Sequence, residues 1–297
     1  MRAGASLKTM VVLASLGVAV ATVARSELDS DGNDTRAESA FEAGNPRELI
    51  EPAVQMLAPP ASLRRIEAVV RRGDSTERWI AHQAIRGIAG ERSTAIVVIH
   101  PESMRGTALI ARQQSGRRPT VWTYDPATEK RTRIARLDPA QPLFGSDLAL
   151  EDLGLLDVTQ RSWTLAGGTD LQDVPTYLFD EIAPGARGRP ADTVKDWVAV
   201  DDGTLLRREV RSADGKLRKS VVYDSISEVE GIFVPSFSRI ADRTNGGTTD
   251  LHVRDIRFDV HVPKSLFDPR KITELEEHQA WSHLSEPTFE AVEPEAN

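Results

Sequence analysis

The chain has 297 residues, of which 28% are charged and 40% hydrophobic, and its formal net charge is −8. This acidic balance disfavours binding to nucleic acid or to an anionic membrane surface. The chain contains no cysteine, which excludes disulfides and a lipid-modified cysteine, so its stability must come from a hydrophobic core.

Residues 1–24 have the three-part layout of a secretory signal peptide. Arg2 and Lys8 supply the positive start, a 16-residue uncharged apolar run follows, and residues 19–21 read AVA, which suits a cleavage site. The alternative is a membrane anchor, but the run is shorter than the roughly 20 residues that span a bilayer. We therefore expect export to the periplasm and removal of residues 1–24.

Three further segments follow the signal peptide. Residues 25–44 are polar and predict a flexible leader, and residues 285–297 predict a disordered acidic tail. Residues 45–284 form the expected folded domain. It begins with a helix over residues 46–58, because Pro46 suits a first helical position and Ile50, Val54 and Leu57 share one face.

From about residue 63 to residue 262 the hydrophobic period becomes two, which is typical of β-strands. Thirteen such segments are separated by short turns, among them residues 201–203 (DDG), 214–215 (DG) and 245–247 (NGG). Only residues 145–157 and 263–278 also look helical. We predict an α+β fold in which consecutive strands form one antiparallel meander. Such a sheet can curl over helices, pack on a second sheet or close into a barrel, and the helices favour the curled sheet.

Residues 143–153 read LFGSDLALEDL and carry three carboxylates, Asp147, Glu151 and Asp152. A metal or acid–base site is one interpretation. The other is a short helix capped by Ser146 or Asp147, with three leucines packed on one side. We favour the capped helix, because a catalytic carboxylate pair usually comes from separate strands or loops.

No other motif indicates catalysis or a cofactor. The six histidines lack zinc-site spacing, and there is no nucleophile elbow or phosphate loop. Residues 29–34 (DSDGND) resemble a calcium loop but have aspartate where the pattern requires glycine. A triad assembled from distant residues is left open by the sequence, although no pattern argues for one. We expect no enzyme activity, no cofactor and no metal site.

Four segments occur in an order that resembles the outer-membrane lipoprotein-sorting family, the LolA-like periplasmic carriers. They are HPESMRGTALI (100–110), VWTYDPATEKRTRI (121–134), LFGSDLALEDL (143–153) and WVAVDDGTLLRREVRSADGKLRKSVVYDSI (197–226). The resemblance implies a single curved antiparallel sheet that forms an open half-barrel, with a few helices covering its opening. It also implies a lipid carrier with an apolar cavity and no catalytic residues.

A carrier of this kind must bury an acyl chain, which costs about 0.8 kcal/mol per methylene in water. We expect large apolar strand residues to line the cavity, although the same residues could fill a dry core. The expected partners are lipoproteins or other acylated lipids and an inner-membrane lipid exporter, and not nucleic acid. The alternative function is an envelope structural or interaction protein without lipid cargo. The candidate lining residues are Leu109, Trp122, Tyr124, Ile134, Trp163, Phe179, Trp197, Val221, Tyr223 and Phe233.

Overall fold

A computed structural model describes residues 46–88, 91–114, 117, 119–135, 140–153, 161–182, 192–244, 246–258 and 260–285. The predicted signal peptide, the leader and nearly all of the acidic tail lie outside these residues. No helix in the described part of the chain is long and apolar enough to cross a membrane.

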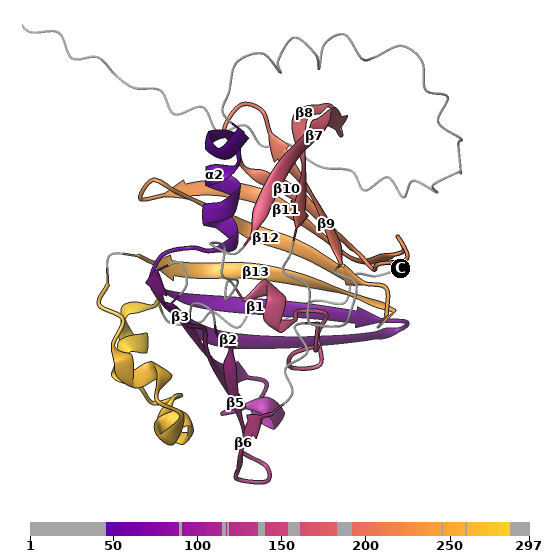
Figure 1. Cartoon of the computed structure of the whole chain (residues 1–297). Helices are drawn as coiled ribbons and strands as arrows, with labels where there is room; N and C mark the ends of the chain where they lie inside the picture. The colour runs from indigo at the N-terminus through magenta and orange to yellow at the C-terminus, as the bar shows by residue number, and fades with distance from the viewer. Residues whose placement is uncertain are drawn as a thin grey trace, which may run out of the picture.

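All thirteen predicted strands are present, and they form one antiparallel sheet (Figure 1). Its order is β6-β5-β4-β3-β2-β1-β13-β12-β11-β10-β9-β8-β7, so β1 and β13 meet in the middle and β6 and β7 are the two ends. The strands are β1 (Ser62–Arg72), β2 (Ser75–Ile88), β3 (Glu91–His100), β4 (Ala108–Arg112), β5 (Thr120–Asp125), β6 (Lys130–Ile134), β7 (Ser162–Leu171), β8 (Val174–Ile182), β9 (Thr193–Ala199), β10 (Leu205–Arg211), β11 (Leu217–Val229), β12 (Ile232–Asp242) and β13 (Gly247–Arg257).

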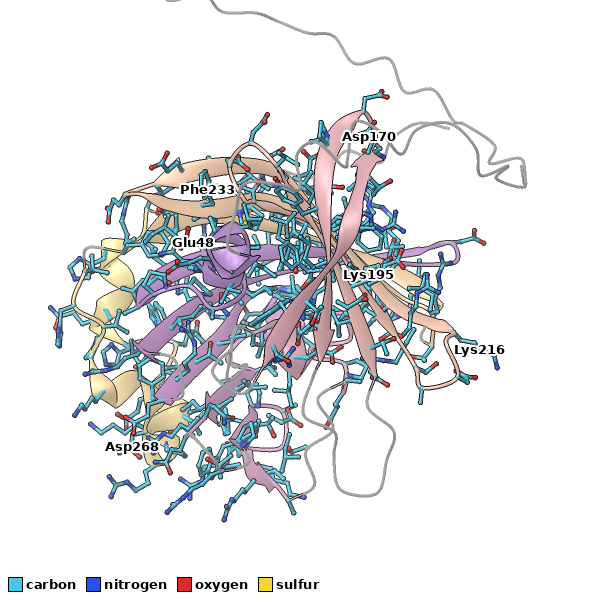
Figure 2. All side chains as sticks on the ribbon, turned by 45° about the horizontal axis from the view of Figure 1, so that its top comes forward. Glu48, Asp170, Lys195, Lys216, Phe233 and Asp268 are labelled. Carbon is cyan, nitrogen blue, oxygen red and sulfur yellow. The ribbon has the colours of Figure 1, made fainter. Side chains whose placement is uncertain are left out.

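The sheet curls instead of closing into a barrel, which confirms the predicted open half-barrel. Helix α2 (Pro46–Leu57) contacts β12, β10 and β7, although four strands separate β12 from β7 in the sheet. A straight helix can touch both strands only if the sheet bends around it. In the view of Figure 2, α2, marked by Glu48, lies between the two limbs of the sheet.

The short turns behave as their sequence predicts. Gly203 and Gly215 have φ angles of +71° and +80°, which glycine adopts without the penalty of a Cβ atom. Gly203 also lies against α2, because a Cβ added there would be 2.8 Å from Cγ of Pro52. The β9–β10 turn therefore helps to fix the helix inside the curled sheet.

The predicted helix over residues 145–157 is wrong in length. Only the 3-10 turn η2 (Leu150–Asp152) forms among residues 140–153. The backbone before it is a tight loop, in which Pro142 and Ala149 form a β-bridge and Phe144 has a positive φ. Asp152, and not Ser146 or Asp147, caps the turn, since its Oδ2 accepts from the Ala149 backbone N–H at 2.7 Å.

The predicted helix over residues 263–278 is also wrong. This region forms the 3-10 segments η4 (Lys264–Phe267) and η5 (Pro269–Glu274), and η6 (Gln279–His283) follows. A residue before proline avoids the helical region of φ and ψ. Asp268, which precedes Pro269, accordingly has φ −83° and ψ 111°, so one continuous helix cannot form.

The sheet has an inner and an outer face, which alternate along each strand. The inner face carries Ile66, Leu109 and Val221 and packs against α2 and residues 143–153. The outer face carries Ala108 and Ile110 and packs against the C-terminal 3-10 segments. Both faces are therefore apolar over β1–β4, and each has its own cover.

Candidate ligand-binding hollow

The candidate site is the inner hollow, which we define as the inner face of the sheet between its two curled limbs. Cross-strand neighbours build its apolar wall: Ile66 pairs with Ala81 on β2, and Ile96 on β3 pairs with Leu109 on β4. These side chains are all at most 2% exposed. The wall exists because alternate residues in the central part of β1–β4 are apolar and the strands bring them side by side.

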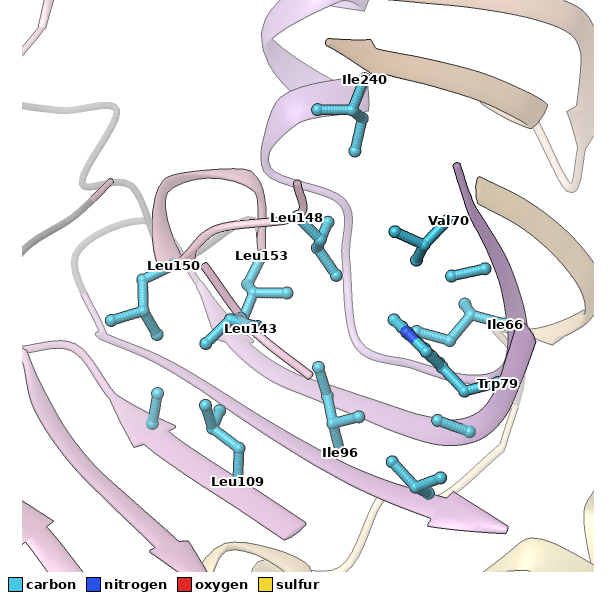
Figure 3. Close-up of a cluster of buried hydrophobic side chains, with 14 of the residues drawn as sticks. Ile66, Val70, Trp79, Ile96, Leu109, Leu143, Leu148, Leu150, Leu153 and Ile240 are labelled. Atoms are coloured by element: carbon cyan, nitrogen blue, oxygen red, sulfur yellow. The ribbon is translucent and has the colours of Figure 1, made fainter. Parts of the chain in front are cut away.

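Residues 143–153, here called the covering segment, fill this part of the hollow. Leu143, Leu148, Leu150 and Leu153 point from the segment towards the strands, as Figure 3 shows. Phe144 meets the indole of Trp79 edge to face, with ring centroids 5.5 Å apart. The apolar wall is thus sheltered from water by a loop, and not by a second layer of regular structure.

The three carboxylates of the covering segment anchor it to the sheet. Asp147 accepts from the Thr249 hydroxyl at 2.9 Å and lies 3.4 Å from the Arg72 guanidinium. Glu151 and Asp152 lie against Lys219, whose side chain is 1% exposed, and Arg218 lies 3.1 Å from Glu151. Asp147 is paired with Arg72, whereas Glu151 and Asp152 share Lys219. Every carboxylate of the motif is thus used to hold the segment on the sheet, which supports the structural interpretation of this motif.

The other limb of the hollow is lined with buried charge. Glu181 on β8 pairs with Arg208 on β10 and with Arg161, and Asp196 on β9 lies 3.8 Å from Arg208. Trp163 donates to Asp196 at 3.2 Å. Burial raises the pKa of Asp196 to about 7, only partly opposed by this hydrogen bond. The hollow therefore combines an apolar wall over β1–β4 with a charged wall over β8–β11.

Several buried polar atoms in the hollow have no hydrogen-bond partner among the residues that the structure describes. They include the indole Nε1 of Trp79 on the apolar wall and Oδ1 of Asp196 on the charged wall. Buried donors and acceptors are normally paired, and an unpaired one carries a free-energy cost of about 1–3 kcal/mol. A ligand carbonyl or hydroxyl in the hollow could satisfy these atoms.

The structure brings six of the ten predicted lining residues to the inner face. Tyr223 packs against both the apolar wall and the cluster around α2, so it joins the two limbs. Burial raises the pKa of its phenol, which keeps the hydroxyl protonated at neutral pH. The six inner residues are Leu109, Ile134, Trp163, Phe179, Val221 and Tyr223.

The other four predicted residues are not in the hollow. Trp122 and Tyr124 pack with the outer cluster, opposite Ile110 and Ala108. Strand alternation puts Trp197 and Phe233 on the outer face too, since each is adjacent to a buried inner residue, Asp196 or Val234. The prediction was wrong at these four positions because the size of a side chain does not show which face of a strand it occupies.

The prediction missed several residues that the structure places in the hollow. Ile66 and Ile96 lie at the base of the wall, and Trp79 contacts the covering segment. A signal was present in the sequence, because residues 66, 68 and 70 are all apolar and fall on one side of a strand. Within the described residues, no group of three histidine or acidic side chains could hold a metal ion.

Comparison with known proteins agrees with this fold. A family model described as an uncharacterized protein family matches residues 90–274. A DUF1329 family protein from Desulfovibrio piger has a TM-score of 0.69 at 19% identity and covers 76% of this chain and 98% of its own. An outer membrane lipoprotein-sorting protein domain from Vibrio parahaemolyticus has a TM-score of 0.66 at 15% identity, covering 80% and 96%.

A third solved structure supports the same architecture. A LolA superfamily protein from Nitrosomonas europaea has a TM-score of 0.62 at 18% identity and covers 76% of this chain and 98% of its own. No curated protein matched the chain. At these identities the likeness establishes the fold, and the resemblance to the LolA-like proteins is confirmed at that level.

Proposed function

The chain belongs to the family whose model matches residues 90–274, its fold is LolA-like, and on that premise we propose that it is a periplasmic carrier of acylated cargo. The cargo is a lipoprotein or another lipid whose acyl chains enter the inner hollow. The observation that carries the proposal is the apolar wall under the covering segment. A ligand displaces a loop at lower cost than a packed layer of strands or helices.

The energetics suit a ligand that replaces the covering segment. A 16-carbon chain gains on the order of 11 kcal/mol by leaving water, and each leucine of the segment gains about 1.5–3 kcal/mol by burial. Four leucines thus oppose the acyl chain with about 6–12 kcal/mol, a free energy of similar size. Binding and release would both be feasible, which is what a carrier requires.

The polar groups of the hollow suit the other end of an amphiphile. The unpaired indole N–H of Trp79 could donate to an ester or amide carbonyl of the cargo. The charged wall around Arg208 lies on the other limb of the same hollow. A lipid whose acyl chain lies on the apolar wall would then meet polar groups of the protein at its other end, within the same curled sheet.

The test is to lock the covering segment in place. Because the protein has no cysteine, the double variant Asp147→Cys/Thr249→Cys offers a single possible disulfide between segment and strand, at side chains that already touch. Binding of a fluorescent fatty acid is measured on delipidated protein before and after reduction. We expect the oxidised variant to lose saturable binding and the reduced variant to recover it.

A matched control keeps a disulfide but leaves the segment free. Arg207→Cys/Val222→Cys joins directly opposed residues of β10 and β11, on the face away from the covering segment. This variant should bind the probe equally in both redox states. If the locked protein binds as well as the reduced one, the hollow is not the site, and absence of any saturable binding by wild-type protein would refute the carrier function.

A second candidate function is an envelope interaction protein without lipid cargo. It is favoured by one observation, namely that the leucines of the covering segment already fill the apolar wall. Native mass spectrometry of protein purified from its own envelope separates the two functions. A co-purifying lipid supports the carrier, and a stoichiometric protein partner without lipid supports the alternative.

A further inference from the structure

A cavity lies on the outer side of the molecule, away from the inner hollow. It has a volume of about 610 Å³ and opens between strands β4–β6 and the C-terminal 3-10 segments. Its position is marked in Figure 2 by Asp268, on the C-terminal segment. The residues that line it are Arg112, Trp122, Arg131, Lys264, Ser265, Asp268, Pro269 and Arg270.

The cavity is strongly basic in an otherwise acidic protein. Four cationic side chains line it against a single carboxylate, Asp268. Arg270 occupies that carboxylate through hydrogen bonds of 2.8 and 3.1 Å, which lower the pKa of Asp268 to about 2. Asp268 is therefore ionised at neutral pH and neutralises only one of the four positive charges.

Two of the remaining cations are held in position without being neutralised. Arg112 and Arg131 donate to the backbone carbonyls of Phe267 and Pro269, which fixes their guanidinium groups without cancelling charge. Among the residues that the structure describes, no carboxylate forms an ion pair with Arg112, Arg131 or Lys264. A cavity with three uncompensated cations favours an anionic ligand.

Trp122 holds Arg112 at the wall of the cavity. The guanidinium carbons of Arg112 and Arg133 each lie 5.8 Å from the centre of its indole ring, within the range of a cation–π contact. The indole and the Phe267 carbonyl together orient the Arg112 guanidinium before a ligand arrives. Planar, pre-positioned guanidinium groups are well suited to bidentate binding of phosphate oxygens.

Ser265 adds a neutral donor. Its Oγ lies 2.9 Å from Nε2 of His278, and Nδ1 of His278 accepts from the Ala280 backbone N–H at 3.1 Å. Burial and the charge of Lys271 lower the pKa of His278, so the ring is neutral at pH 7. Its single proton must then be on Nε2, which donates to Ser265.

This tautomer determines what Ser265 can do. The Ser265 oxygen already accepts from His278, so its own O–H is free to donate to a group in the cavity. The same tautomer prevents Nε2 from taking the serine proton, as a hydrolase base must. The pair therefore fits anion binding better than nucleophilic catalysis.

We propose that this outer cavity is a binding site for a phosphate group, held by Arg112, Arg131 and Lys264 with Ser265 as a neutral donor. The phosphate could belong to a lipid headgroup or to a free phosphorylated metabolite, since both present the same oxygens. The site is separate from the inner hollow, so it goes beyond the carrier function and does not depend on it.

The experiment measures binding of inorganic phosphate by calorimetry, and in parallel the sedimentation of the protein with vesicles of phosphatidylcholine alone or mixed with phosphatidic acid. The test variant is Arg131→Gln/Lys264→Gln, which spares the buried contact of Arg112. We expect its phosphate affinity to fall by about tenfold or more. Asp268→Asn should bind phosphate more tightly, because the competing carboxylate is lost while Asn can still cap η5.

The control is Arg211→Gln/Lys216→Gln, which removes the same charge from an exposed turn region elsewhere. It should leave binding unchanged. Pocket-dependent binding of inorganic phosphate supports a free phosphorylated ligand, and binding only to phosphatidic acid vesicles supports a headgroup. The proposal is overturned if neither binds, or if test and control variants weaken binding equally. Phosphate binding without fatty acid binding would leave this site intact and refute only the carrier function.

Discussion

Truncating one leucine of the covering segment should strengthen cargo binding while it weakens the fold. Leu148 is 2% exposed and belongs to the cluster that fills the hollow. Leu148→Ala removes side-chain burial and leaves a cavity, which should lower the free energy of unfolding by about 3 kcal/mol. If cargo must displace the segment, that loss lowers the free energy of opening by the same amount. Because each 1.4 kcal/mol is a factor of ten, apparent affinity should rise by up to about 100-fold.

The assay combines titration of a fluorescent fatty acid with urea unfolding of the same preparations. Leu266→Ala is the matched control, since Leu266 is fully buried but lies in the outer cluster under the C-terminal segments. Both variants should lose comparable stability, and only Leu148→Ala should gain affinity. Equal or weaker probe binding by Leu148→Ala would show that the leucines are permanent core and that cargo does not enter beneath them.

Three further variants test the charged wall, the α2 contact and the anchor of the covering segment. The free energy of unfolding of the wild-type protein should fall as pH rises from about 4 to about 7, because the unfolded chain releases the Asp196 proton at a lower pH than the folded protein does. In urea titrations Asp196→Asn should lack this pH dependence, which gives it a relative gain of at most about 4 kcal/mol by pH 8. Gly203→Ala should cost about 1–3 kcal/mol more than Gly215→Ala, since both have positive φ but only a Cβ at 203 meets Pro52; thermal unfolding of the pair measures the difference, and equal losses would contradict the contact with α2. Lys219→Met should cost about 3–5 kcal/mol, because Asp152 loses its cation whereas Glu151 keeps Arg218. Amide hydrogen exchange in the covering segment should accelerate, and unchanged protection would count against the anchor.

The sheet was predictable because its information is local. Each strand shows apolar alternation, and short turns such as the one at Gly215 join neighbours, so a meander follows with little ambiguity. The C-terminal region was harder, because Pro269 breaks a helical pattern that charge and leucine spacing otherwise suggest. The spacing of apolar residues there shows which side chains are buried, but it does not show whether they lie on one helix or on several tight turns.

The site was less predictable, for a physical reason. Period two shows that Trp122 and Tyr124 share a face, and they do, but it cannot show which face is inside. Both faces of β1–β4 are apolar, because the covering segment packs on one and the C-terminal segments on the other. Only the pairing of distant elements resolves the choice. The Ser265–His278 contact likewise depends on two tight turns that no spacing rule anticipates.

The open ends of the sheet are places where two copies of the molecule could associate. Within the part of the chain that the structure describes, β6 and β7 each have a strand neighbour on one side alone, and such edge strands are templates for fibre growth. Strand β6 reads KRTRI and its first four residues are exposed, so a second copy approaching in register would bring like charges together. The open shape that a carrier needs is thus compatible with remaining monomeric, and replacing the basic residues of β6 with threonine should make the protein prone to aggregate.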